Sequence, residues 1–154
     1  MLFVGNSEHT IDSKQRLAVP AKFRAGWDAQ KDGSAWYCIP WPTGHLRLYT
    51  EGQFREMAEA QQSSLTPAEE EAGLDTTMYG LAERLEMDST GRITVPKQLL
   101  EMTRIETEVV VVGARSRLEI HDKGRWADTL ADRFKQLPEL INKINEQKRV
   151  APRG

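Results

Sequence analysis

The sequence contains one motif twice. Residues 12–20 read DSKQRLAVP and residues 88–96 read DSTGRITVP, so Asp, Ser, Arg, Val and Pro recur at the same places 76 residues apart. In each copy a polar turn separates an extended segment from a short alternating strand. The proline that closes the strand suits the first position of a helix, where no backbone donor is needed. The pattern predicts an internal duplication of a strand, turn, strand and helix.

The duplication extends beyond this motif. Residues 45–54 (HLRLYTEGQF) align with residues 117–126 (RLEIHDKGRW) at an offset of 72, which gives the first copy a four-residue insertion that we place near residues 36–44. Both stretches alternate apolar and polar residues and then reach a helix start, with Thr50 and Asp122 as the expected N-caps. Each repeat is therefore predicted to run strand, strand, helix, strand, strand, helix.

These repeats predict an α+β fold with one shared core. Each half has only about 70 residues, which is near the size at which a separate core is marginal. The alternation along the two short strands places Arg16 and Arg92 on the outer face. It places four aliphatic residues on the inner face: Leu17, Val19, Ile93 and Val95.

The segment between the copies is acidic. Residues 51–75 hold seven acidic side chains against Arg55 alone, and residues 66–69 (TPAE) read as a capping box with Pro67 first in the helix. We expect a helical hairpin whose acidic face is solvated and would repel a phosphate backbone. From Lys123 onward basic residues predominate, and residues 147–154 lack periodicity, which predicts a frayed basic tail.

Charge and composition narrow the functional classes. A net charge of −2 lacks the overall basic character of a nucleic-acid binder, so such a function would have to depend on local charge. The first motif has that charge, because Lys14 and Arg16 are followed by two further cations within residues 12–24, whereas the second motif has Thr90 in place of the lysine. The alternative interpretation is an ion pair between the aspartate and the arginine that only braces each turn.

Other chemistries have little support in the sequence. The single cysteine, Cys38, lies in an apolar strand and is expected to be a small buried hydrophobe rather than a nucleophile. His9, His45 and His121 are isolated without ligand spacing, and no glycine-rich loop resembles a nucleotide cradle, so we expect neither a metal nor a cofactor. The N-terminus has no signal-peptide pattern and no membrane span, which favours a soluble cytoplasmic protein.

These motifs resemble the two signatures of the MraZ family. Residues 8–17 together with residues 19–20 and 23–24 resemble the first signature, and residues 85–96 resemble the second. The resemblance implies a bacterial transcriptional regulator in which tandem AbrB-like half-barrels form a pseudo-dimeric β-barrel with flanking helices. It also implies a ring-shaped homo-oligomer that binds short direct repeats of double-stranded DNA upstream of the division and cell-wall gene cluster, and association with the nucleoid.

The resemblance divides the chain into four parts. Residues 1–62 form the first AbrB-like repeat and residues 63–82 the acidic helical connector. Residues 83–137 form the second AbrB-like repeat, and residues 138–154 form a C-terminal helix end and basic tail. The apolar helical faces that follow each repeat exceed what a thin half-barrel covers, so we expect them to pack between subunits. They are Phe54, Met57, Trp126, Leu130 and Phe134.

The resemblance also implies roles for residues of the turns. Arg16 and Arg92 take the position of the DNA-facing motif arginine, and Asp12 and Asp88 that of the aspartate that braces the turn. Arginine offers a planar fork that can engage the guanine edge, whereas Lys14 supplies a point charge for phosphate.

Two positions depart from the family pattern. Gln15 stands in place of a glycine, and Thr90 in place of a lysine. Both are retained as secondary DNA-contact positions. Tyr49 and Trp126 follow strand and helix periodicity, which favours packing over base stacking.

Two rival functions remain open. One is a non-catalytic protein-interaction module of the antitoxin kind, because fold does not determine function. The other is a hydrolase in which Asp12 and Asp88 share a proton. That chemistry normally needs glycine two residues after each aspartate, where Lys14 and Thr90 stand, and the adjacent arginines would keep both carboxylates ionised. We therefore expect no enzyme, no small-molecule substrate and no membrane partner.

Overall fold

The computed structural model describes residues 1–150 and has the predicted α+β composition. The chain divides into two compact units, Met1–Lys123 and the residues from Gly124 onward. Residues 151–154, the end of the expected basic tail, lie outside the described residues. Across the described part of the chain, the helices are too short or too polar to cross a membrane.

The order of elements follows the predicted repeat. The first copy comprises β1 (Asn6–Thr10), β2 (Arg16–Ala18), α1 (Ala21–Arg24), α2 (Ala29–Asp32), β3 (Ala35–Trp41), β4 (His45–Thr50) and α3 (Glu51–Glu59). Next come α4 (Glu69–Leu74) and a π-helical turn, η1 (Asp75–Tyr79). The second copy comprises β5 (Glu83–Glu86), β6 (Arg92–Thr94), α5 (Lys97–Thr103), β7 (Glu108–Gly113), β8 (Leu118–Asp122) and α6 (Lys123–Lys135), and α7 (Leu137–Val150) follows. The predicted order of strands and helices is thus confirmed, with α2 as an additional helix.

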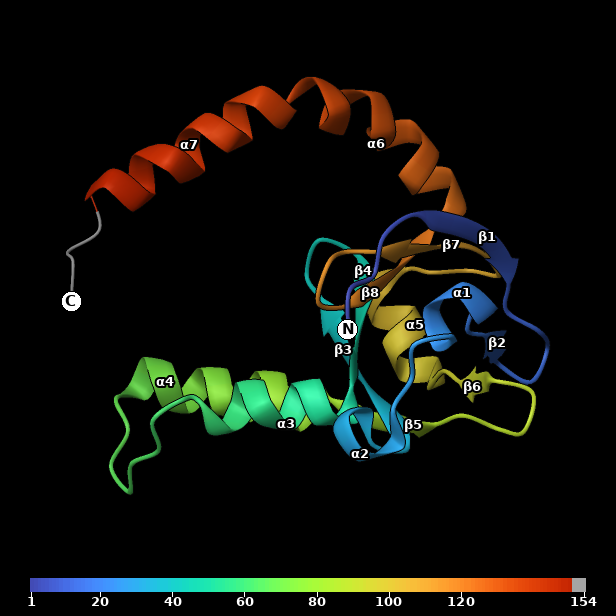
Figure 1. Cartoon of the computed structure of the whole chain (residues 1–154), viewed down its shortest axis with the longest axis horizontal. Coiled ribbons are helices and arrows are strands. Elements are labelled where there is room, and N and C mark those ends of the chain that lie inside the picture. The colour runs from blue at the N-terminus through green and yellow to red at the C-terminus, as the bar shows by residue number, and fades with distance from the viewer. Residues whose placement is uncertain (151–154) are drawn as a thin grey trace. The chain divides into compact units, whose positions relative to one another are not determined.

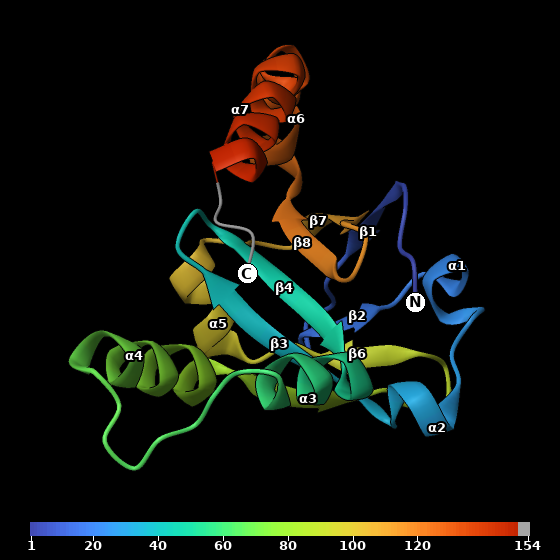
Figure 2. The same cartoon turned by 60° about the vertical axis from the view of Figure 1, so that its left-hand side comes forward.

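The strands form a six-stranded sheet and a separate two-stranded ribbon (Figures 1 and 2). The sheet has the order β1-β7-β8-β4-β3-β5 with antiparallel neighbours, and β2 pairs with β6 to form the ribbon. Exchanging equivalent strands of the two copies reproduces the same order in reverse. Each copy's first strand also pairs with the other copy, since β1 lies on β7 and β5 lies on β3.

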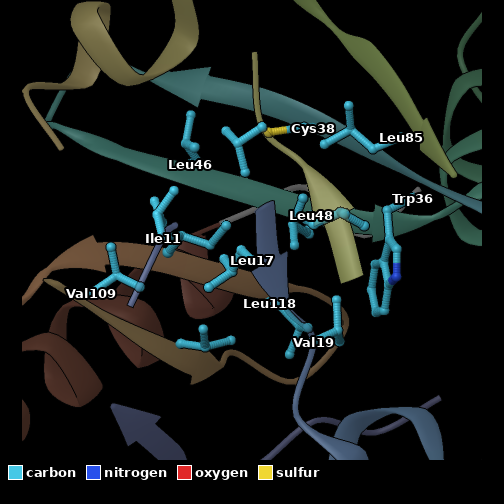
Figure 3. Close-up of a cluster of buried hydrophobic side chains, with 14 of the residues drawn as sticks. Ile11, Leu17, Val19, Trp36, Cys38, Leu46, Leu48, Leu85, Val109 and Leu118 are labelled. Carbon is cyan, nitrogen blue, oxygen red and sulfur yellow. The ribbon is translucent and has the colours of Figure 1, made fainter. Parts of the chain in front are cut away.

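The core lies between the ribbon and the sheet (Figure 3). The four aliphatic residues predicted to face inward are all buried in one cluster, which confirms the shared core: Leu17, Val19, Ile93 and Val95. Cys38 is also completely buried there, and burial raises the pKa of its thiol well above the usual range. The thiol is therefore a packing group, as predicted.

Most of the extra residues of the first copy lie elsewhere than predicted. The first hairpin is only one residue longer than the second, because 14 positions separate the paired Trp36 and Thr50 and 13 positions separate the paired Val109 and Asp122. The longer connection is that from α1 to β3, which contains α2. This short helix is capped by Asp28 and packs so closely on α3 that a Cβ at Gly52 would collide with the carbonyl of Lys31.

Helix ends agree with the sequence in part. The Thr50 hydroxyl accepts a hydrogen bond from the Gln53 amide at 3.2 Å, which confirms that cap. The predicted box at residues 66–69 is wrong, because α4 begins only at Glu69, after Ala68, without a side-chain cap. Pro20 and Pro96 keep extended backbone and precede α1 and α5 instead of opening them. Residues 147–150 belong to α7, so the expected frayed tail does not begin at residue 147.

Tyr49 and Trp126 pack against protein, as expected. Phe54, which was predicted to face another subunit, differs. Tyr49 is buried, and the Arg133 guanidinium lies over the ring of the half-buried Trp126. Phe54 is covered within its own unit, because its ring stacks on Tyr37 with centroids 4.3 Å apart. Phe54 is therefore largely engaged within its own unit, whereas Met57, Leu130 and Phe134 remain exposed.

Candidate functional site

Each motif folds into a turn that is closed by its aspartate. The Asp12 carboxylate accepts hydrogen bonds from the backbone amides of Lys14 (2.9 Å) and Arg16 (2.8 Å) and from Arg16 Nε (2.7 Å). The Asp88 carboxylate repeats this pattern, with the amides of Thr90 (2.9 Å) and Arg92 (3.0 Å) and with Arg92 Nε at 2.8 Å. Two segments 76 residues apart thus adopt one geometry because an ionised aspartate satisfies the same three donors in each.

Hydrogen bonding keeps both aspartates ionised. The backbone amide and side chain of Arg16, with the Lys14 amide, hold the pKa of Asp12 below its usual range. The Arg92 amide and the Thr90 hydroxyl do the same for the pKa of Asp88. Each carboxylate is saturated within its own turn, so this geometry opposes the sharing of a proton that a paired-aspartate hydrolase needs.

The ribbon brings the two motif arginines onto one face. Arg16 pairs with Thr94 and Ala18 pairs with Arg92, so these four side chains alternate with the buried Leu17 and Ile93. The two arginines are diagonal neighbours, which places their Cα atoms about 7–8 Å apart. The small side chains of Ala18 and Thr94 between them are exposed. The outer face of the ribbon is therefore flanked by a guanidinium at each end.

Each motif arginine is oriented by its aspartate but keeps hydrogen-bond donors for another molecule. Arg16 and Arg92 retain side-chain exposures of 34% and 37%. Within residues 1–150 both bind protein through Nε, which leaves the Nη atoms for an external acceptor. The ion pair that spacing suggested as a purely structural feature exists in both turns, and it also orients each arginine.

The two turns differ at the residue with left-handed backbone. Gln15 has a φ of 63° and Gly91 a φ of 81°, a region that non-glycine residues occupy only at a cost. Over Gly91 lies the guanidinium of Arg24, whose Nε donates to the Val19 carbonyl at 2.8 Å, and a Cβ on Gly91 would meet the Arg24 Cζ at 2.5 Å. The residue equivalent to Arg24 in the second copy is the buried Leu100. Only the second turn therefore lacks room for a side chain.

The remaining predicted positions flank the arginines. Lys14 is exposed, and only its backbone amide is engaged by Asp12. Thr90 is also exposed, but its hydroxyl donates to Asp88 at 2.8 Å. The structure thus places Lys14, Gln15 and Arg16 at one end of the ribbon and Thr90 and Arg92 at the other, since β2 and β6 are antiparallel.

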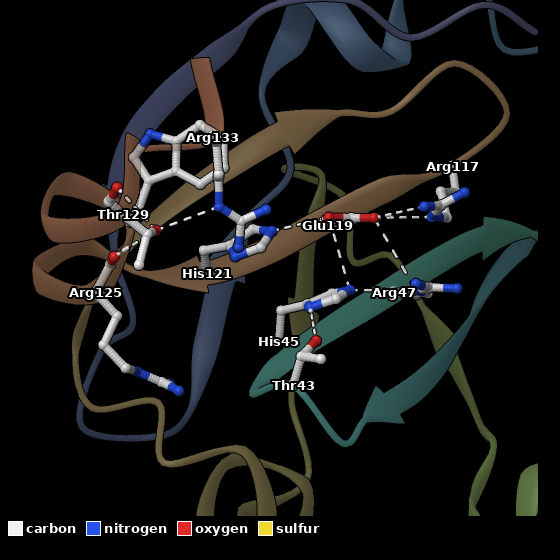
Figure 4. A network of polar contacts seen from close by, with 10 residues as sticks. Thr43, His45, Arg47, Arg117, Glu119, His121, Arg125, Thr129 and Arg133 are labelled. Carbon is white, nitrogen blue, oxygen red and sulfur yellow. Dashed lines mark hydrogen bonds and ion pairs between the residues drawn. The ribbon is translucent and has the colours of Figure 1, made fainter. Parts of the chain in front are cut away.

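A cluster of histidines and charges was missed by sequence reasoning. Strands β4 and β8 pair His45 with His121, whose rings stack 4.6 Å apart, and Glu119 lies between them and two arginines, Arg47 and Arg117 (Figure 4). The prediction that these two histidines are isolated is therefore wrong. Sequence spacing gave no signal, because the pairing of two distant strands creates the cluster.

The cluster has strongly shifted protonation equilibria. Burial lowers the pKa of His45 to about 4, against the opposing charge of Glu119. Burial alone would raise the pKa of Glu119, but the His121 hydrogen bond, His45 and Arg117 bring it to about 2. At neutral pH the centre therefore holds an ionised carboxylate beside a neutral His45.

Fold and site together define a class of protein: a two-copy α+β chain whose equivalent polar turns present arginines on one exposed ribbon. Residues 78–150 match the family model described as MraZ protein, putative antitoxin-like. The chain is 33% identical over 151 residues to the transcriptional regulator MraZ of Chlorobaculum parvum, covering 92% of each protein. It is 31% identical to that of Ligilactobacillus salivarius, covering 90% of this chain and 95% of the relative. The chain therefore belongs to the MraZ family.

Proposed function

We propose that this protein is a DNA-binding transcriptional regulator whose contact surface is the outer face of the β2–β6 ribbon. Relatives at about the same length bear the name transcriptional regulator. The observation that carries the proposal is the pair of oriented, part-exposed arginines, Arg16 and Arg92, on one face. Arginines fixed through Nε present their remaining nitrogens to base edges with little further ordering.

Each turn residue has a distinct role in this proposal. Arg16 and Arg92 read base edges, and Lys14 neutralises phosphate. Gln15 precedes Arg16 in the turn and adds a side-chain amide, the group that suits adenine, while Thr90 offers at most a weak polar contact. Asp12 and Asp88 do not touch DNA but hold the arginines.

The proposal includes the duplicated architecture and an oligomer. Two AbrB-like half-barrels that form a pseudo-dimer are supported by two observations. The strand order is the same in reverse when the copies are exchanged, and the first strand of each copy, β1 or β5, pairs with a strand of the other copy. A ring is supported by apolar side chains on α6 and α7 that stay about half exposed or more: Leu130, Phe134, Leu137, Leu140, Ile141 and Ile144. A ring would present the same ribbon to successive direct repeats upstream of the division and cell-wall genes. A nearly neutral protomer needs that avidity.

A protein-interaction module remains the second candidate. The exposed apolar helices favour it, and the matching family model carries the words putative antitoxin-like. This candidate predicts no specific affinity for DNA, so one binding assay separates the two. Neither of these two proposed functions is catalytic.

The test is binding of the pure protein to the DNA upstream of its own gene. Arg16→Ala should abolish specific binding, while the turn persists because Asp12 still accepts the two backbone amides. Melting temperature should change little, since exposed ion pairs contribute about 0–1 kcal/mol. Arg55→Ala, at an exposed arginine on α3, is the matched control and should bind as the wild type does. Retained binding by folded Arg16→Ala would refute the proposed contact surface.

A further inference from the structure

We propose that the centre formed by His45, Glu119 and His121 binds a divalent transition-metal ion such as Zn²⁺. One ligand atom from each side chain lies within 4.8 Å of the other two. All three side chains are nearly buried, with exposures of 8%, 12% and 7%. Two imidazoles and one carboxylate form a donor set that suits zinc and its neighbours better than magnesium or calcium.

The distances from the two histidines to Glu119 are close to those of a tetrahedral site. His45 Nε2 lies 3.6 Å and His121 Nε2 lies 2.8 Å from the same oxygen, Glu119 Oε1. Ligand atoms bound to zinc at about 2.0–2.1 Å are separated by about 3.3 Å in a tetrahedron. The first distance therefore needs to close by about 0.3 Å and the second to open by about 0.5 Å. The rings of His45 and His121 now stack with 19° between their planes, so both would also have to turn before their Nε2 lone pairs converge on one ion.

Neighbouring side chains direct Glu119 Oε1 and the lone pair of His45 Nε2 toward the proposed metal site. Arg117 holds the other oxygen of Glu119 from Nε (2.9 Å) and Nη2 (2.8 Å), which leaves Oε1 directed at the histidines. His45 Nε2 accepts a hydrogen bond from Arg47 Nε at 3.1 Å, so Nε2 carries the lone pair and Nδ1 carries the proton that faces the Thr43 hydroxyl. This is the tautomer of a histidine that binds metal through Nε2.

Arg47 is the competitor for this site. Its Nε occupies the lone pair of His45, and its positive charge opposes a dication. The guanidinium also lies 3.6 Å above the Trp41 ring, so it can leave His45 and keep a favourable contact. Metal binding would replace the Arg47 hydrogen bond, and the proton between His121 Nε2 and Glu119 would move to Nδ1 or to solvent. The site is therefore expected to be modest in affinity and sensitive to Arg47.

The experiment titrates tag-free protein with Co²⁺ and then with Zn²⁺. Wild-type protein should develop visible d–d bands typical of a four- or five-coordinate Co²⁺ site, and Zn²⁺ should remove them and raise the melting temperature. His45→Gln and Glu119→Gln should lose the bands, whereas His9→Gln, which removes a histidine on β1, should keep them. Thr43→Val should weaken binding about tenfold through the loss of ligand orientation.

Arg47→Met tests the competition between Arg47 and the metal ion. It removes the competing donor and charge but keeps an apolar stem over Trp41, so Co²⁺ affinity should rise about tenfold. A structural ion network without metal affinity predicts no bands in any variant. Absence of bands in the folded wild type, retention of bands in His45→Gln, or a thiolate charge-transfer band from Cys38 would each overturn the proposal. The wild-type spectrum is decisive even if a ligand variant fails to fold.

Discussion

Exchanging the left-handed residues of the two turns tests how the copies came to differ. Gly91→Gln places a side chain at a φ of 81° and directs its Cβ against the Arg24 guanidinium. The left-handed backbone costs about 1–2 kcal/mol for a residue other than glycine. The displaced Arg24 also loses its hydrogen bond to the Val19 carbonyl, which contributes about 1 kcal/mol. Replacement of the glycine also lowers the entropy of the unfolded chain, which offsets about 0.5–1 kcal/mol, so we expect a net destabilisation of about 1.5–2 kcal/mol.

The reciprocal change should have the opposite sign. Gln15→Gly relieves the same backbone cost at a φ of 63°, but it increases the entropy of the unfolded chain by about 0.5–1 kcal/mol. The net result should be a gain of about 0.5–1 kcal/mol in the free energy of unfolding. Urea unfolding measures both changes, with an unchanged m value as the sign that the folded state is intact.

Making Gly91→Gln in an Arg24→Ala background measures how much of its destabilisation comes from displacing Arg24. With the guanidinium absent, Gly91→Gln should cost about 1 kcal/mol less than it does in the wild type, because the Arg24 bond is already lost. Equal penalties in the two backgrounds would show that Arg24 does not restrict the second turn. A Gly91→Gln variant as stable as the wild type would refute the whole account of the asymmetry.

The other stability and assembly predictions depend on burial and exposure. Leu17→Ala and Ile93→Ala should each lower the free energy of unfolding by about 2–5 kcal/mol in urea, because both empty a fully buried site. Thr50→Ala should cost about 1 kcal/mol in the same assay through loss of the α3 cap. Light scattering should show a large homo-oligomer that Phe134→Glu, at an exposed residue of α6, reduces to smaller species. A wild-type monomer at micromolar concentration would remove the avidity argument.

The features that could be predicted from the sequence are those governed by local chemistry. The turn at residues 12–16 forms because one aspartate bonds donors no more than four residues away, and the same five positions are visible in the second copy. Alternation alone separated the buried Leu17 and Val19 from Arg16. The Thr50 cap likewise depends on a residue three positions away. Each of these signals is complete within a few residues of the chain.

The features that were missed depend on contacts between distant segments. His45 corresponds to Arg117 in the repeat alignment, and it meets His121 only because β4 and β8 are neighbours in the sheet. The spacing of metal ligands along a sequence does not identify His45 and His121 as neighbours, because they lie on strands distant in the chain. Helix α2 was missed for a related reason, since four residues carry no periodicity and the helix is held by Asp28 and by packing on α3.

The divergence between the copies bears on how the ribbon would meet DNA. Both turns keep the aspartate and the arginine, whose hydrogen bonds build the turn, whereas the neighbouring positions 14 and 90, and 15 and 91, have diverged. Lys14 and the Gln15 amide therefore stand at one end of the ribbon, whereas the Arg24 guanidinium lies over Gly91 at the other. An asymmetric ribbon has a direction, which suits direct repeats better than palindromes.

Exchanging Lys14 and Thr90 tests this direction. Lys14→Thr should weaken binding to all DNA sequences alike and reduce the slope of log affinity against log salt by about 0.9 for the lost phosphate contact. Thr90→Lys should increase the slope by a similar amount, at a small cost in stability because the Thr90 hydroxyl leaves Asp88. Arg92→Ala should lose less affinity than Arg16→Ala in the wild type. The two losses should become similar in the Thr90→Lys background, where both turns carry a lysine. Equal losses for both arginines in the wild type would show that the ribbon has no preferred end, and the proposed link between asymmetry and direct repeats would fail.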